Sequence, residues 1–418
     1  MRARCAILIP AALVASGLLV LAGCAERQRA NPFDPANRTT QGRPAGFMAL
    51  ARDGRVDLVW QAQTAAGLVG YEVWRRTASE STFRAISAVL KPSVTHYADV
   101  GLLNGLDHHY RLYYVLDSGP GAGPAEDIAT PGPQVPWVAD GADGALLEVT
   151  ADGRHVAASH NGFVRPVSVA VDTSTNQVWS SDPDAAEVRV LDAASGVTVT
   201  IPVGGTPGAI ATVSGDSTAW VCAEDGGLVL HLGPEGQRLG TWSGFQLPLG
   251  VAISGFDGSL WVCEHDGNRV WRRDFDLGTS TSTALPQPSR VAVDAATGEA
   301  WVTSFSSALV WRLSPTGAPV DTIAGFVGPV GLAVDSQRGN VWVADPAGDQ
   351  IRVFAPDGTP RFTVGGLPGA RSVAVDPATG DGWVAAITSG EVIRISASGA
   401  VIRRLAGTGT PNDIAVMR

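Results

Sequence analysis

Short runs of alternating apolar and polar residues, separated by turn residues, cover most of the 418-residue chain. Beyond residue 136 the pattern repeats as an apolar run, a turn, a run with a tryptophan, a second turn and a third run. One unit shows all three runs, VGLAVD at 330–335, NVWVAD at 340–345 and QIRVFAPDG at 350–358. Alternation with period two, bounded by Gly, Pro, Asn and Asp, predicts β-strands rather than helices.

The tryptophans of these runs set the period of the repeat. They recur at intervals of 40 to 42 residues, as Trp137, Trp179, Trp220, Trp261, Trp301, Trp342 and Trp383. Four short strands per unit at this period are typical of a propeller blade, so the sequence predicts a seven-bladed β-propeller over residues 137–418. A residue found in every unit most simply packs one blade against the next, so these tryptophans are predicted to be core residues.

The two ends of the repeat complement each other. The first tryptophan run has only Pro-rich residues before it, whereas the apolar run at 412–418 has no tryptophan run after it. Val416 lies 41 residues after Val375, its equivalent in the preceding unit. We therefore expect the C-terminal strand to complete the first blade and to close the ring.

A different pattern covers residues 44–117. Val56, Leu58 and Trp60 alternate with polar residues, and a similar run ends at Tyr114, which predicts a small β-sandwich. The strings GRVDLVWQ, GLVGYEVWRR and THYADVGLLNGLDHHYRLYYV resemble a fibronectin type III domain, with Trp60 as its core tryptophan. The Gly- and Pro-rich residues 118–136 are predicted to be a linker. The expected fold class is thus all-β, a sandwich followed by a propeller.

The N-terminus indicates where the protein goes. Basic residues precede an apolar run that ends in LAGC at 21–24, and this string resembles the lipobox of bacterial lipoproteins. The resemblance implies a signal peptide at 1–23, a lipid on Cys24 and a tether at 24–43. Ala25, in place of Asp, implies the outer membrane of the cell envelope, with the lipid anchor as the membrane contact. An uncleaved helix and a plain secretory signal are the alternatives.

Composition restricts the partners further. The formal net charge of −10 disfavours nucleic acid, which is bound through basic surfaces.

Cys222 and Cys263 both stand two positions after a tryptophan, in successive blades. Such side chains point the same way around a ring, so we expect free, buried thiols rather than a disulfide.

Polar residues at positions where the repeats differ can encode a ligand site. The second strand of a blade ends, and the innermost strand begins, on the same face of a propeller. The polar residues at these positions form our candidate ligand-binding face, namely Asp140, Asp182, Glu264, Arg290, Asp345, Arg371, Asn412 and Asp413. The alternative is that the acids cap turns through backbone hydrogen bonds and face water.

The units resemble NHL-type repeats, and this resemblance implies a binding or scaffold module for a protein, peptide or glycan rather than an enzyme. The sequence shows no nucleophile with a base, no carboxylate pair and no metal-ligand spacing, so no catalytic residue, metal or cofactor is predicted. The pair Glu264–His265 in WVCEHDGNRV is similar to virginiamycin B lyase, a family with several His and Glu on one face. A propeller lyase or hydrolase is therefore the alternative function.

Overall fold

The computed structural model describes residues 30–418, so the predicted signal peptide and Cys24 lie outside the described residues. The chain divides into two compact units, Met1–Gly132 and Pro133–Arg418. Within residues 30–418 the elements are antiparallel β-strands and one short 3-10 helix, η1 (Pro346–Gly348). No helix within residues 30–418 is long and apolar enough to cross a membrane. The predicted all-β fold is confirmed.

The first unit contains two antiparallel sheets. One consists of β1 (Met48–Arg52), β2 (Arg55–Val59) and β5 (His96–Val100), and the other of β4 (Arg84–Ala85), β3 (Leu68–Thr77), β6 (His108–Leu116), β7 (Gly119–Pro120) and β8 (Ala125–Ala129). Alternate residues of both sheets, such as Leu58 and Leu112, are fully buried. The rings of Trp60 and Tyr71, one from each side, have centroids 5.4 Å apart. The two sheets therefore share one core.

Residues 118–136, predicted to be a linker, contribute strands to the structure. β7 and β8 both pair with β6, and β8 places Asp127 opposite Tyr110. The carboxylate of Asp127 also accepts a hydrogen bond from the Ala49 amide, 2.8 Å away. The Gly and Pro content suggested a linker, but short edge strands tolerate these residues because one side of an edge strand has no partner.

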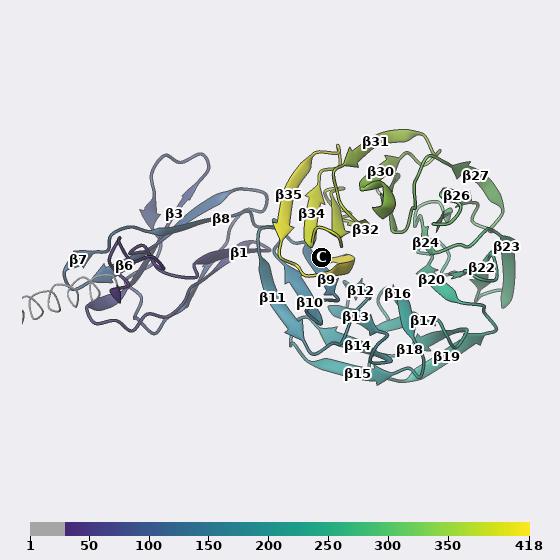
Figure 1. The fold of residues 1–418 in the computed structure, drawn as a ribbon, viewed down its shortest axis with the longest axis horizontal. Coiled ribbons are helices and arrows are strands. Elements are labelled where there is room, and N and C mark those ends of the chain that lie inside the picture. Colours follow the sequence, from purple (N-terminus) through teal and green to yellow (C-terminus); the bar gives the residue numbers. More distant parts are fainter. Residues whose placement is uncertain (1–29) are drawn as a thin grey trace, which may run out of the picture. The chain divides into compact units, whose positions relative to one another are not determined.

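The second unit consists of seven four-stranded antiparallel sheets arranged in a ring, whose inner strands surround the centre (Figure 1). From the inside outward, the first sheet consists of β36 (Pro411–Met417), β9 (Val135–Asp140), β10 (Ala145–Val149) and β11 (Val156–Asn161), and the second of β12 (Ser168–Asp172), β13 (Gln177–Asp182), β14 (Glu187–Asp192) and β15 (Thr198–Pro202). The third sheet consists of β16 (Pro207–Val213), β17 (Thr218–Ala223), β18 (Leu228–Leu232) and β19 (Arg238–Ser243), and the fourth of β20 (Pro248–Ile253), β21 (Leu260–Glu264), β22 (Arg269–Asp274) and β23 (Thr279–Ala284). The other three are β24 (Arg290–Val293), β25 (Ala300–Ser304), β26 (Leu309–Leu313) and β27 (Pro319–Ile323); β28 (Leu332–Asp335), β29 (Asn340–Asp345), β30 (Gln350–Phe354) and β31 (Pro360–Gly365); β32 (Ala370–Val375), β33 (Gly382–Ala386), β34 (Glu391–Ile395) and β35 (Val401–Ala406). Sheets of this size around a common centre form a β-propeller, as the repeat predicted.

The C-terminal strand joins the two ends of this unit. β36 pairs with β9 in an antiparallel register that places Ile414 opposite Val138 and Pro411 opposite Asp140. The first sheet is therefore built from both ends of the repeat, as the sequence predicted.

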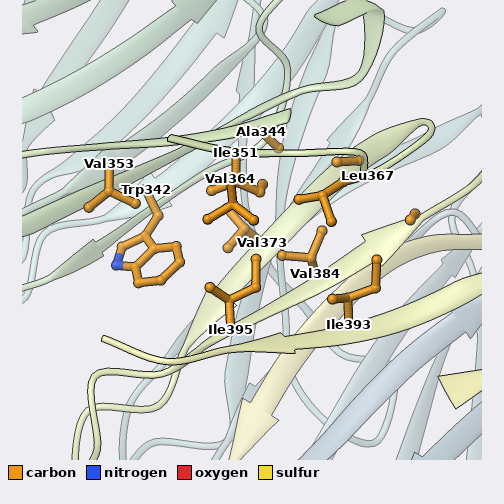
Figure 2. Packing of buried hydrophobic residues seen from close by; sticks show 12 residues of the cluster. Trp342, Ala344, Ile351, Val353, Val364, Leu367, Val373, Val384, Ile393 and Ile395 are labelled. Atoms are coloured by element: carbon orange, nitrogen blue, oxygen red, sulfur yellow. The ribbon is translucent and has the colours of Figure 1, made fainter. Parts of the chain in front are cut away.

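Apolar side chains pack successive sheets together. Trp342 and Ile351 lie in one cluster with Val373 and Ile393 of the next sheet, and all four are at most 5% exposed (Figure 2). The tryptophans of the other units occupy the same position, and all are 0–1% exposed except Trp220, at 7%. Burial of such large side chains contributes about 2–3 kcal/mol each, so the repeated tryptophan holds the ring together.

Candidate functional site

The candidate acids lie at the ends of second strands, where the sequence placed them, but their carboxylates are not exposed. Asp140, Asp182 and Asp345 are 0% exposed and Glu264 is 5% exposed. Each accepts hydrogen bonds from the loop that leads into the inner strand of its own sheet. For Asp182 the donor is the Val164 amide at 2.6 Å.

The same arrangement recurs around the ring. The amide of Val327 donates to Asp345 at 3.0 Å and that of Gln246 to Glu264 at 2.8 Å. The second oxygen of Glu264 accepts from the indole nitrogen of Trp271 at 2.6 Å. A buried carboxylate with amide donors satisfies a loop backbone that would otherwise have no partner.

Asp140 and Ser304 also stand three residues after a repeated tryptophan, and both bind the loop before the inner strand although one is an acid and the other a hydroxyl residue. The Thr410 amide donates to Asp140 at 2.8 Å, yet burial raises the pKa of this carboxyl above its usual value. In the β24–β27 sheet, Ser304 reverses the polarity and donates to the Pro286 carbonyl at 2.6 Å. The ligand-binding role predicted for Asp140, Asp182, Glu264 and Asp345 is therefore corrected to loop anchoring. They cap turns, as the alternative held, but they do not face water.

Asn412 and Asp413 connect the first sheet to its neighbours. The Asn412 amide donates to the Pro166 carbonyl at 2.8 Å, just before β12. The Asp413 carboxylate accepts from the Ser168 hydroxyl and the Val169 amide of β12, both at 3.0 Å. It also accepts from Ser372 of β32 at 2.5 Å. Three sheets thus meet at one carboxylate, so both residues serve ring closure, and the ligand contact predicted for them stays a prediction.

Arg290 and Arg371 remain as candidates for ligand binding. Both are half-buried at the starts of the inner strands β24 and β32, a place we call the inner rim. Arg290 donates to the Leu249 carbonyl at 2.8 Å. Arg371 forms no hydrogen bond or ion pair within residues 30–418. Burial, and then the charge of Arg290, lowers the pKa of Arg371, although Asp413 opposes this shift.

Glu224 also belongs to the inner rim, although it is not among the residues predicted from the sequence. It directly follows β17, and its carboxylate lies over the start of β16, where a side chain on Gly208 would collide with it. Burial raises the pKa of Glu224, while the charge of Arg290 lowers it. Glu224 is the fourth residue after Trp220, one position beyond the third residue that defines the acids of the candidate face. The polar residue at this fourth position is the sequence signal for Glu224.

The pair Glu264–His265 does not assemble a lyase-like site in the described structure. Glu264 is occupied by Gln246 and Trp271, and a ring nitrogen of His265 lies 3.2 Å from the Pro288 carbonyl oxygen. Within residues 30–418, no three His, Cys, Asp or Glu side chains are grouped so that they could hold a metal ion. Cys222 and Cys263 are free and fully buried, as predicted, and burial raises the pKa of both thiols.

Sequence comparison gives no match to a protein-family model or to a curated protein. Solved structures do match. A protein of unknown function from Desulfotomaculum acetoxidans is 16% identical with a TM-score of 0.59, covering 68% of this chain and 99% of its own. A 6-phosphogluconolactonase-like protein of Bacteroides uniformis is 13% identical with a TM-score of 0.58, over 68% and 99% of the two chains. Virginiamycin B lyase of Staphylococcus aureus is 17% identical with a TM-score of 0.51, over 58% and 84%. At this level the likeness concerns the fold, and Pro133–Arg418 is a β-propeller.

Proposed function

We propose that this chain is a lipid-anchored envelope protein whose seven-bladed propeller, counting each sheet of the ring as a blade, binds an anionic group at the inner rim. The proposed ligand is a protein, peptide or glycan that presents a carboxylate or phosphate. Arg290 and Arg371 would contact it, and no catalytic step is included. The corrected roles of the candidate acids leave these two arginines as the ligand-contacting part of the predicted face.

The observation that carries the proposal is the half-buried guanidinium of Arg371, which lacks a hydrogen-bond acceptor within residues 30–418. Burying a cation near a second cation is unfavourable unless an anion compensates. An anionic group between Arg290 and Arg371 would supply the missing acceptor, and guanidinium groups bind carboxylate and phosphate in bidentate geometry. An anion is therefore the ligand that this charge arrangement favours.

The test compares wild type with the Arg290→Ala/Arg371→Ala variant. Inorganic phosphate and a glutamate-rich peptide are titrated against both proteins by calorimetry at low salt. We expect wild type to bind at least one probe and the double variant to bind it at least about tenfold more weakly, the equivalent of about 1.4 kcal/mol. Replacing the exposed Arg84 and Arg361 with alanine changes the net charge equally and serves as control. Equal affinity of all three proteins, or no binding by wild type, would overturn the proposal.

Anchoring is a separate part of the proposal, and it rests on the lipobox-like residues 21–24. Cys24→Ser removes the sulfur that would carry the lipid. We expect the variant to move from the membrane fraction to the soluble fraction of the host cell, since the proposed anchor consists of the acyl groups on Cys24. Unchanged membrane fractionation would contradict the anchor.

For the N-terminal unit we propose a fibronectin type III-like domain that spaces the propeller from the membrane. Its two sheets and the buried Trp60 between them support this assignment.

A further inference from the structure

The residue opposite the repeated tryptophan is an arginine in three sheets of the ring, and in one other sheet it is a histidine. In the β24–β27 sheet, Arg312 pairs across the strands with Trp301, and its guanidinium lies over the indole, 5.9 Å from the ring centroid. Glu299 holds that guanidinium with an ion pair of 2.8 Å. Two further sheets place Arg272 and Arg394 at this position. In the β16–β19 sheet the position is His231, opposite Trp220.

His231 is held in one orientation by a short chain of hydrogen bonds. Its ring stacks on Trp220 with centroids 4.5 Å apart and an angle of 4° between the planes. Nε2 lies 2.8 Å from the Thr218 hydroxyl, which donates its only proton to Asp216 Oδ1 at 2.7 Å. Nε2 must therefore carry the imidazole proton, and Nδ1 is an acceptor. Burial lowers the pKa of His231, which favours the neutral ring, although the charge of Asp216 opposes this shift.

The next sheet also departs from the repeat where it covers Trp220. In two sheets the turn after the third strand brings a glycine onto the tryptophan of the preceding sheet: a Cβ on Gly317 would lie 3.8 Å from Trp261, and one on Gly153 3.0 Å from Trp383. Over Trp220 the equivalent turn carries Phe275, whose ring centroid is 5.5 Å from the indole. Phe275 is still 44% exposed.

These departures leave a pocket between the two sheets. It has a volume of about 240 Å³, with Trp220, Phe275, Val213 and Ile253 as apolar walls, and His231 and Asp216 as the ionisable groups of its lining. Asp216 Oδ2 accepts no hydrogen bond within residues 30–418, because Thr218 uses Oδ1. Asp216 precedes β17, whereas Glu224 follows it, so this pocket and the inner rim lie at opposite ends of that strand.

We propose that this pocket is a binding site for a guanidinium group, presented by an arginine of a peptide or by a small guanidine. Two other sheets support this assignment, because there Arg312 and Arg394 of the chain itself lie on the tryptophan and pair with a carboxylate. Here the smaller His231 leaves the volume empty while a carboxylate and aromatic rings remain. Asp216 Oδ2 and the Nδ1 of a neutral His231 are acceptors, and a guanidinium offers several donors with a flat face for the rings.

The test uses N-acetyl-arginine amide and its neutral isostere, N-acetyl-citrulline amide, with the purified full chain and saturation-transfer NMR. We expect the arginine compound to bind with a dissociation constant on the order of 1 mM, and the citrulline compound at least about tenfold more weakly. An arginine-containing peptide that binds more tightly than the amide would identify a peptide as the source of the group, and equal affinity would identify a small guanidine. Equal binding of arginine and citrulline, or no binding of arginine, would overturn the proposal.

Two variants assign the binding to this pocket. Asp216→Asn keeps the turn to Thr218 but removes the charge. His231→Arg fills the pocket with an arginine, as Arg312 and Arg394 do in their sheets. We expect each variant to weaken arginine binding at least about tenfold. Asp357→Asn is the matched control, because Asp357 holds Thr359 with hydrogen bonds of 3.0 and 2.7 Å, nearly those of Asp216. Full binding by His231→Arg, or an equal loss in Asp357→Asn, would place any arginine binding elsewhere and refute the proposal.

Discussion

Replacing Asp413 with alanine is expected to destabilise the propeller strongly. The carboxylate accepts hydrogen bonds from Ser168 and Val169 of β12, from Ser372 of β32 and from the Ile414 amide of its own strand. It is thus the point at which β36 is tied to both neighbouring sheets. Alanine keeps the strand but removes every one of these acceptors.

The size of the effect follows from the donors that lose their acceptor. Val169 is 5% exposed, so its amide would stay buried without a partner, which costs about 1–3 kcal/mol. The two serine hydroxyls can turn toward other acceptors, so each contributes about 0.5–1 kcal/mol. The expected loss is about 3 kcal/mol, or a decrease in Tm of about 6 °C for a unit of this size.

Denaturant and thermal unfolding followed by tryptophan fluorescence measure this loss. Asp413→Asn retains one carbonyl acceptor and should lose roughly half as much. Asp357→Ala, in an exposed turn where the side chain accepts only from Thr359, should stay within about 0.5 kcal/mol of wild type. If Asp413→Ala unfolds at the same midpoint as Asp357→Ala, the carboxylate does not hold the ring together and the reasoning fails.

Three other properties can be checked with simple measurements. Burial raises the pKa of Glu224 above its usual 4.5, so ionisation destabilises the folded state as the pH rises through that raised pKa. Glu224→Gln should therefore melt above wild type at pH 7 and together with it below about pH 4, and a gap that persists at low pH would contradict this origin. Deleting 408–418 removes β36 and leaves β9 as an open edge, so cooperative unfolding should be lost; an unchanged Tm would refute the closure. Cys222 and Cys263 should react with iodoacetamide only after unfolding, because both are buried and their pKa is raised. Labelling of the native protein at either cysteine would show that the core opens there.

The propeller could be predicted because the same sequence pattern recurs in every unit. A tryptophan every 40 to 42 residues reports the same packing position each time, and alternation around it defines the strands. Closure was predictable for the same reason, since Val416 stands in register with Val375. The strand β8 was not, because AEDIA at 125–129 has too few apolar residues to indicate pairing by itself.

The candidate site could be predicted only in part, because the sequence does not reveal which backbone groups need a partner. A short acid at the end of a strand looks the same whether it meets a ligand, as predicted for Asp182, or the Val164 amide, as found. The sequence shows that His231 stands where three other units carry an arginine. The pocket beside it could not be predicted, because one of its walls is Phe275 of a neighbouring sheet, and only the structure places both rings against Trp220.

Ring closure through β36 also sets the order of events during folding. The partners Asp140 and Pro411 are separated by most of the propeller sequence, so their pairing belongs to the slowest class of contacts. Until then, β9 keeps a free edge beside a newly formed sheet, and such edges capture strands of other chains. The folding chain passes through this open-ring stage before β36 pairs. The yield of folded protein should therefore depend on how quickly the last strand arrives, and chaperones that cover strand edges should improve it.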